Sequence, residues 1–246
     1  MYLEVLLPSI LALYALHKKK ITLSGVIFAW ILGIIILTWG GYFAFIALAL
    51  VFILTIITDK IKKTKKDKTR DIKQMISNVL IAAICIVLFH LTNDNMFYIM
   101  YFAVIASSLS DTMASSIGTL SKKRPINIFT RKKLNTGESG GVSLLGLVAS
   151  LFGGMIIGGI YLISQYNVLN FILIALMGLT GSIFDSILGT LFEGKYICLK
   201  CGIKVEENFH CNYPTKLVEG FASIDNNMVN LLNNIFIFVL SYILLY

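Results

Sequence analysis

Apolar runs of membrane-spanning length constrain this chain more than any other feature of its sequence. Two of them, GVIFAWILGIIILTW at 25–39 and FAFIALALVFILTII at 43–57, follow each other almost directly. A helix needs about 20 mostly apolar residues to cross the hydrocarbon core of a bilayer. The chain is 57% hydrophobic and only 14% charged, whereas soluble domains carry about 25% charged residues. We therefore predict an all-α, polytopic helical membrane protein.

The apolar segments divide the chain into about eight predicted transmembrane helices. They cover residues 2–16, 21–39, 41–58, 75–91, 96–117, 141–163, 168–192 and 228–246. The first segment lacks the basic start and the small-residue cleavage site of a signal peptide. We find no internal repeat, so residues 1–246 are predicted to form a single integral membrane domain. Two loops of this domain stand out, a basic, glycine-rich loop at 118–140 and a Cys/His loop at 193–220.

The distribution of basic residues predicts how the helices are oriented. All 21 Lys and Arg residues fall in alternate loops, and the connectors between those loops hold none. The basic loops are 17–20, 59–74, 118–140 and 193–220. If all eight segments span, these loops share one side, and the positive-inside rule makes that side cytoplasmic. We therefore expect a multi-pass protein of the cell membrane, with both termini extracytoplasmic.

The positive charge of the chain also bears on its partners. The basic run at 60–70 suits anionic lipid headgroups as well as a plain stop-transfer loop. Topology already explains the net charge of +8, so nucleic acid is not needed to account for it. We expect membrane lipids as partners, and no nucleic acid.

Three of the apolar segments carry polar residues along one helical face. The stripes consist of Ser108, Asp111, Thr112, Ser115 and Thr119, of Gly178, Gly181, Ser182, Asp185, Ser186 and Gly189, and of Asp225, Asn226, Asn230, Asn233 and Asn234. Small residues at such helical spacing commonly serve close packing between membrane helices. The three aspartates lie near predicted cytoplasmic ends, where they could supply the oxygen ligands that Mg²⁺ takes. We therefore predict a shared metal or substrate site, with Asp111, Asp185 and Asp225 as catalytic metal ligands.

The loop behind Asp111 combines positive charge with glycine, in the stretch SKKRPINIFTRKKLNTGESGGVS at 121–143. Backbone N–H groups at a helix start favour anions, and flanking basic side chains pair with phosphate oxygens. The spacing does not match the Walker P-loop, and topology alone also explains the basic residues. Basic groups, backbone donors and carboxylates in one place nevertheless predict a phosphoryl-transfer site.

Five motifs, in this order, resemble those of one integral membrane family. They are SDTMASSIG at 110–118, RPINIFTRKKLNTGESGGVSLLG at 124–146, GSIFDSILGT at 181–190, the C-x-x-C…HC cluster at 198–211 and SIDNNMVNLL at 223–232. The family includes plant and cyanobacterial phytyl-phosphate kinases and eukaryotic transmembrane protein 19. It is distantly similar to the CTP-dependent dolichol kinases and CDP-diacylglycerol synthases. In those families an acidic, Mg²⁺-dependent site inside the membrane handles CTP and a lipid phosphate or alcohol.

The resemblance implies roles for individual residues of this chain. The three aspartates would hold Mg²⁺, and Lys132, Lys133 and the glycine region 137–141 would hold phosphates. The sequence departs from the family at Ser116, where members often have Glu, and at the Asn pair after Asp225, where many have Asn-Asp. Both departures lower the negative charge and leave the number of metal ions open. The candidate nucleotide- or phosphate-binding residues are Lys122, Arg124, Lys132, Lys133, Asn135, Gly137, Ser139, Gly140, Gly141 and Asn226.

The Cys/His loop holds a cluster of soft metal ligands, Cys198, Cys201, His210 and Cys211. A C-x-x-C knuckle followed by two later ligands suits tetrahedral Zn²⁺. The adjacent His–Cys pair is less usual, because neighbouring side chains diverge. Free thiols are the main alternative, and the predicted cytoplasmic position disfavours a disulfide. With all four ligand positions filled, we predict structural rather than catalytic zinc.

Together these features favour a membrane-embedded, Mg²⁺-dependent prenyl-phosphate kinase. It would transfer a phosphoryl group from CTP or another NTP to an isoprenoid monophosphate, such as phytyl or geranylgeranyl phosphate, giving the diphosphate. A cytidylyltransferase that makes a CDP-lipid would use the same parts. An ion-coupled transporter is the alternative of another class, and acidic residues near the bilayer midplane would favour that interpretation. The sequence fixes neither the prenyl chain length nor the nucleotide, and it is compatible with a homo-oligomer.

Overall fold

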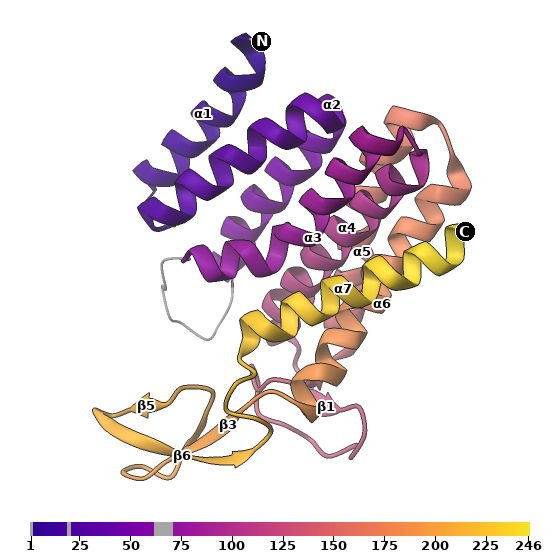
Figure 1. Ribbon diagram of the computed structural model, residues 1–246. Helices are drawn as coiled ribbons and strands as arrows, with labels where there is room; N and C mark the ends of the chain where they lie inside the picture. The colour runs from indigo at the N-terminus through magenta and orange to yellow at the C-terminus, as the bar shows by residue number, and fades with distance from the viewer. Residues whose placement is uncertain (1, 19–20, 62–70) are drawn as a thin grey trace.

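The computed structural model describes residues 2–18, 21–61 and 71–246, and these form a bundle of helices with strands at one end (Figure 1). The helices are α1 Tyr2–His17, α2 Leu23–Ile61, α3 Ile72–Thr92, α4 Asn95–Ile117, α5 Leu144–Gln165, α6 Val168–Leu191 and α7 Asn226–Leu245. Both ends of the chain lie at the end of the bundle away from the strands (Figure 1). Most of the basic run at 60–70 lies outside the described residues.

Six helices of the described chain, α2 to α7, are long and apolar enough to cross a membrane. The shorter α1 is also apolar. α2 covers two of the predicted segments. Its two helical halves meet at a kink at Gly41, which has the non-helical angles φ 77° and ψ −176°. Glycine adopts this positive φ without steric cost, and the ribbon reverses its direction there (Figure 1). The polytopic helical fold is thus confirmed, whereas the predicted number of eight spanning helices is not.

Polar caps explain where the helices begin. The Asp71 carboxylate accepts a hydrogen bond from the N–H of Gln74 at 2.9 Å, and Ser143 Oγ accepts one from the N–H of Gly146 at 3.1 Å. These bonds satisfy amides that have no acceptor inside the helix. Asp94, Asn167 and Asp225 cap α4, α6 and α7 in the same way.

The centre of the bundle is α4, which packs against α2, α3, α5, α6 and α7. Every side chain from Tyr98 to Ser110 is buried. Glycine lets α5 and α6 approach this helix closely, since a Cβ on Gly178 would lie 2.5 Å from Ser110 Oγ and 2.8 Å from the Cα of Gly154. Gly178, in the small-residue stripe on α6, therefore serves helix packing.

A buried polar network joins α7 to α4 and α3. Asn233 Nδ2 donates to Ser107 Oγ at 3.2 Å, and Ser108 Oγ donates to Asn234 Oδ1 at 3.2 Å. Asn234 Nδ2 also donates to the carbonyl of Ser77 at 2.9 Å. Hydrogen bonds of this kind hold membrane helices together where apolar contact with lipid gives no preference. The two asparagines thus bind neighbouring helices rather than a ligand.

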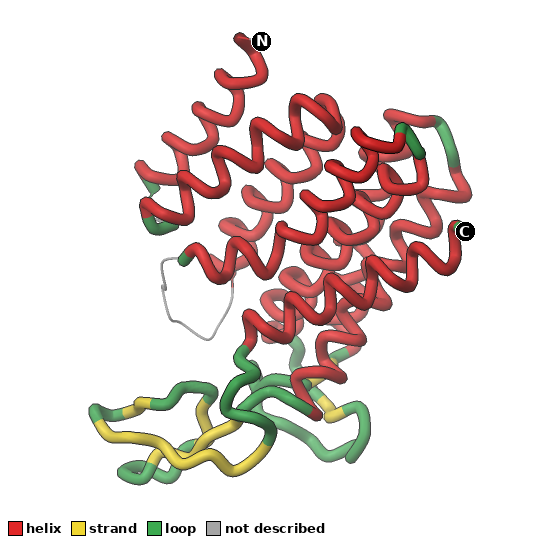
Figure 2. The backbone as a smooth tube through the Cα atoms, in the orientation of Figure 1, coloured by secondary structure: helices red, strands yellow, loops and turns green. Residues whose placement is uncertain are grey.

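The two long loops contain strands that the sequence did not predict (Figure 2). They are β1 Ile126–Asn127, β2 Gly141–Val142, β3 Lys195–Cys198, β4 Lys204–Val205, β5 Phe209–His210 and β6 Tyr213–Glu219. β1 pairs with β2, and the other four form an antiparallel sheet in the order β4-β3-β6-β5. The loop at 193–220 is therefore a folded sheet rather than a flexible connector.

Candidate functional site

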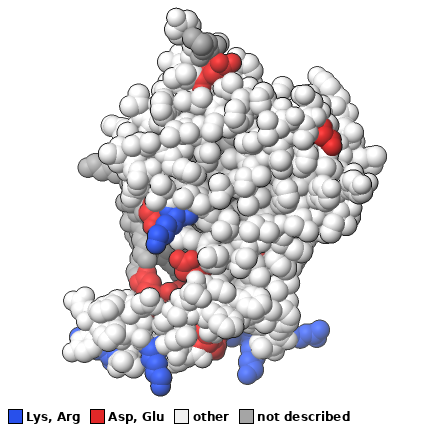
Figure 3. Space-filling model, viewed as in Figure 1, with Lys and Arg blue, Asp and Glu red and all other residues white. Residues whose placement is uncertain are grey.

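A polar cavity of about 250 Å³ opens at the strand end of the bundle. Side chains from α3, α4, α5, α6 and α7 line it, together with the glycine-rich loop and the residue that follows β4. In the space-filling view, acidic atoms gather at the edge of a hollow between the helices and the strand region (Figure 3). The cavity thus lies where the sequence predicts the acidic stripes and the loop to meet.

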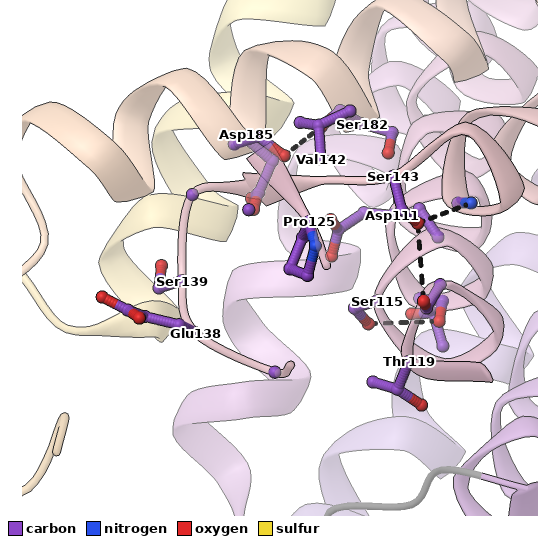
Figure 4. A pocket seen from close by; sticks show the side chains of 18 of the residues that line it. Asp111, Ser115, Thr119, Pro125, Glu138, Ser139, Val142, Ser143, Ser182 and Asp185 are labelled. Atoms are coloured by element: carbon purple, nitrogen blue, oxygen red, sulfur yellow. Dashed lines mark hydrogen bonds between the residues drawn. The ribbon is translucent and has the colours of Figure 1, made fainter. Parts of the chain in front are cut away.

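Two of the three predicted metal ligands, Asp111 of α4 and Asp185 of α6, line this cavity (Figure 4). Their carboxylates are close enough for the two negative charges to interact. Asp185 Oδ1 is buried and has no hydrogen-bond partner within the described part of the chain. No Lys or Arg is among the described residues that line the cavity. A buried carboxylate oxygen without a hydrogen-bond partner is costly, and a cation bound beside Asp185 Oδ1 would satisfy it.

Asp225, the third predicted ligand, is not among the residues lining the cavity. Its side chain is exposed and caps α7, with Oδ1 accepting the N–H of Met228 at 2.9 Å. Oδ2 accepts a hydrogen bond from Asn227 Nδ2 at 3.4 Å. The structure therefore gives Asp225 a capping role and brings its neighbour Asn226 to the cavity instead.

The predicted glycine-rich loop forms one wall of the cavity through Gly137, Ser139, Gly140 and Gly141. Gly140 has φ 80°, and a Cβ at this position would collide with the Thr190 side chain at the end of α6. Only a residue without a side chain allows the loop to lie so close to α6. The loop is therefore held against the helix that carries Asp185.

Two helix starts also face the cavity. Gly146 and Leu147 belong to the first turn of α5, and Asn226 and Asn230 belong to the first turns of α7. The N-terminus of a helix carries partial positive charge, which favours nearby anions. The N–H groups of Gly146 and Met228 are already bonded to the capping side chains of Ser143 and Asp225. The cavity thus combines carboxylates that suit a cation with helix starts that suit an anion.

The basic residues predicted to bind phosphate lie elsewhere. Lys122, Arg124, Lys132 and Lys133 are exposed, and none of them lines the cavity. Asn127 explains the positions of Lys132 and Lys133. Its side-chain oxygen accepts hydrogen bonds from the N–H groups of Phe129 and Thr130, and these bonds fold 127–133 into an outward turn.

Asn135, also predicted to bind phosphate, is exposed and does not line the cavity. Its N–H donates to Glu138 Oε2 at 3.2 Å. This bond closes the glycine-rich loop on itself, so the structure gives Asn135 a part in shaping the loop. The predicted phosphate-binding set is therefore only partly gathered at the cavity.

Three glutamates near the site were not predicted. Glu138 and Glu206 line the cavity, and Glu193 is buried behind the loop, where it accepts a hydrogen bond from Ser139 Oγ. The pKa of Glu193 is raised to about 7, chiefly by burial and then by the nearby negative charge of Glu206, while Ser139 and Lys195 oppose the rise. Glu193 and Glu206 fall in a segment interpreted as a connector, so no helical periodicity marks them.

The four predicted zinc ligands converge in the sheet beyond the cavity. The ligand atoms of Cys198, Cys201, His210 and Cys211 all lie within 4.8 Å of one another. Cys211 and Asn212 both have positive φ, 54° and 60°, in the two-residue turn between β5 and β6. This turn lets the adjacent His and Cys side chains face one centre, which an ordinary extended strand does not allow. A hydrogen bond from the backbone of Cys201 lowers the pKa of the Cys198 thiol to about 6.

Comparison with known proteins gives relatives that span nearly the same length. An uncharacterized membrane protein of Methanocaldococcus jannaschii is 30% identical over 234 residues, covering 91% of this chain and 93% of the relative. Protein PGR of Arabidopsis thaliana is 29% identical over 264 residues, with 92% and 89% covered. An uncharacterized membrane protein of Synechocystis is 29% identical over 206 residues, with 76% and 78% covered. No solved structure matches the chain.

The names of these three relatives state no reaction, and two of them describe membrane proteins. The chemistry of this chain must therefore be argued from its own cavity. The family itself is clear from a match that covers residues 6–238. The chain belongs to the family described as integral membrane protein DUF92.

Proposed function

We propose that this protein is a membrane-embedded, Mg²⁺-dependent phosphoryl transferase that converts an isoprenoid monophosphate to the diphosphate with CTP or another NTP. The observation that carries this proposal is the pairing of Asp111 and Asp185 in a polar cavity at one end of the bundle, beside the glycine-rich loop. The resemblance of the sequence motifs to phytyl-phosphate kinases supports the choice of an isoprenoid acceptor. We place the cavity on the cytoplasmic side, where nucleotides are available.

The donor set of the cavity fits Mg²⁺. Mg²⁺ takes oxygen ligands, commonly one or two carboxylates together with substrate phosphates. Asp111 and Asp185 would hold the ion, and the unpartnered Asp185 Oδ1 is the atom that most needs a cation. Bound there, Mg²⁺ would neutralise charge on the phosphate oxygens as the phosphoryl group moves.

The residues of the chain would bind and orient the two phosphate-bearing substrates. The starts of α5 and α7 direct partial positive charge toward phosphate oxygens, and Asn226 and Asn230 offer side-chain amides as hydrogen-bond donors. Because none of the described cavity residues is Lys or Arg, recognition of the nucleotide would depend on these donors and on the ion. Positioning of this kind supplies most of the catalysis in phosphoryl transfer.

In the reaction, an oxygen of the acceptor phosphate forms a bond to the γ-phosphorus of the nucleotide. The bond between that phosphorus and the β,γ-bridging oxygen breaks, and the bridging oxygen keeps the electron pair. The nucleoside diphosphate leaves, and the isoprenoid carries a diphosphate. The attacking phosphate is already an anion, so no strong general base is required of the protein.

The first experiment measures products and compares three aspartates. Purified protein in detergent is given labelled CTP or ATP with Mg²⁺ and prenyl monophosphates of several lengths. We expect a labelled prenyl diphosphate from the wild type. Asp111→Asn and Asp185→Asn remove a charge but keep the shape, and each should lower turnover by about 10²-fold or more through the loss of a metal contact.

Asp225→Asn is the matched control, because asparagine caps helices as well as aspartate does. This variant should keep near-normal turnover and thermal stability. Normal turnover in Asp111→Asn would contradict the proposed role of the cavity. A CDP-lipid with release of pyrophosphate would instead identify a cytidylyltransferase working in the same cavity.

A further inference from the structure

The Cys/His cluster in the sheet β3–β6 has the spacing of a tetrahedral metal site. His210 Nδ1 lies 3.4 Å from Cys201 Sγ and 3.2 Å from Cys211 Sγ, and the two sulfur atoms lie 3.9 Å apart. Tetrahedral Zn²⁺ with its usual bond lengths would separate two sulfur ligands by about 3.8 Å and sulfur from nitrogen by about 3.5 Å. The four side chains therefore already surround a centre of the size that zinc fills.

The backbone around the cluster is also shaped for a shared centre. Cys198 and Cys201 stand on a tight turn closed by a hydrogen bond from the N–H of Gly202 to the carbonyl of Cys198 at 2.9 Å. Cys211 has a positive φ of 54°, which costs free energy in a residue with a side chain. The two-residue hairpin turn requires this conformation, and a metal ion bound by Cys211 would help to offset its cost.

The sheet has little else to hold it together. Most apolar side chains of residues 195–219 are exposed, including Leu199, Ile203 and Phe209, each more than half exposed. Tyr196 and Cys198 are its buried apolar residues within the described chain. Small units without a sufficient core commonly depend on a structural metal or a disulfide, and the cysteines here are free.

The same sheet forms part of the cavity wall. Glu206, which directly follows β4, lines the cavity. Lys204 of β4 makes ion pairs with Glu138 of the glycine-rich loop at 3.5 Å and with Glu219 of β6 at 2.8 Å. A change in the sheet would therefore move both Glu206 and the loop that carries Ser139 and Gly140.

We propose that Cys198, Cys201, His210 and Cys211 bind one Zn²⁺, and that this ion holds the sheet in place as the outer wall of the acidic cavity. The metal has no open position in this site and takes no part in a reaction. The proposal does not depend on phosphoryl transfer, since any ligand of the cavity would meet the same wall.

The test measures metal content, spectrum and cleavage of the sheet in the full chain in detergent. We expect about one zinc per chain. Replacement by Co²⁺ should give the visible absorption and charge-transfer bands of a tetrahedral site with thiolate ligands. Cys201→Ser and His210→Ala should each lose the zinc and show faster protease cleavage within 195–219, while the helical bundle stays folded by circular dichroism.

Cys85→Ala is the control variant, because Cys85 is a free cysteine buried in α3, far from the cluster in sequence. It should keep the zinc and the slow cleavage. Zinc-free wild type in which the three cluster cysteines are reactive thiols, or in which Cys201 and Cys211 form a disulfide, would overturn the proposal. If the wild type contains zinc and Cys201→Ser loses it, but protease cleaves both proteins at the same rate, the ion does not hold the sheet in place. None of these readouts uses enzymatic activity, so the outcome stands apart from that of the phosphoryl-transfer test.

Discussion

At the scale of single residues, Asp185 and Asp225 show how similar sequence contexts lead to different roles. Both lie near one end of an apolar helix, and both occur in a polar stripe. Asp225 comes just before the apolar run of α7, which is the usual position of an N-cap, and its side chain accepts the N–H of Met228. Asp185 lies inside its helix, where capping is impossible, and its Oδ1 has no partner among the described residues. The position of each aspartate relative to the start of its helix therefore separates the capping residue from the cavity residue.

Glu193 gives a prediction about pH at this scale. Its pKa is raised to about 7 by burial, with Glu206 adding to the rise, Ser139 and Lys195 opposing it and Asp225 adding a smaller increase. Between about pH 4.5 and pH 7 the folded protein keeps this proton while the unfolded chain loses it, so stability falls as pH rises. The free energy of unfolding falls by about 3 kcal/mol in total, and the fall is complete above pH 7.

The measurement compares thermal or denaturant unfolding of the wild type and Glu193→Gln between pH 5 and pH 8. Glutamine can still accept the hydrogen bond of Ser139 but carries no charge, so the variant should lose this part of the pH dependence and be the more stable protein at pH 8. An equal decline in both proteins would show that Glu193 does not titrate in this range.

At the scale of elements, the contact between α6 and the pair α4 and α5 can be tested through glycine. Gly178→Ala would place a methyl group 2.5 Å from Ser110 Oγ and 2.8 Å from the Cα of Gly154. Overpacking of this kind costs about 1–3 kcal/mol. Gly159→Ala on α5 is the matched control, since a Cβ there meets nothing within 4 Å, and alanine improves helix propensity by up to about 1 kcal/mol. Unfolding measurements should show opposite signs for the two variants, and equal stability would contradict the close packing.

The elements also show how much of the fold the sequence could predict. Apolar length placed α3 to α7 within a few residues, because this signal acts locally. The strands β3 to β6 were missed, since they are short and their order depends on pairing between residues far apart. The exposed position of Lys132 and Lys133 depends on the hydrogen bonds of Asn127, which no charge pattern reveals. The sequence therefore indicated Asp111, Asp185 and the glycine-rich wall of the cavity, whereas the positions of the basic residues depend on how their loop folds.

At the scale of the whole molecule, the orientation of the bundle in the membrane is the property to test. The connectors at 92–95 and 164–167 lie at the end of the bundle away from the strands (Figure 1). With the basic loops facing the cytoplasm, Tyr166→Cys should react with a membrane-impermeant thiol reagent in intact cells, because Tyr166 is 87% exposed. Lys122→Cys, in the exposed basic loop, should react only after the membrane is opened. Labelling of Lys122→Cys in intact cells would reverse the orientation.

The polar network between α4 and α7 has a consequence for how the chain is made. Ser107 and Ser108 find their side-chain partners in Asn233 and Asn234, which leave the ribosome 126 residues later. Domains synthesised in order fold as their partners arrive, so the hydroxyls on α4 stay without these side-chain partners until α7 is inserted. A nascent chain that stops at residue 225 should therefore span the bilayer yet remain loosely assembled and open to quality-control proteases. Insertion of α7 would then supply the missing partners and close the bundle.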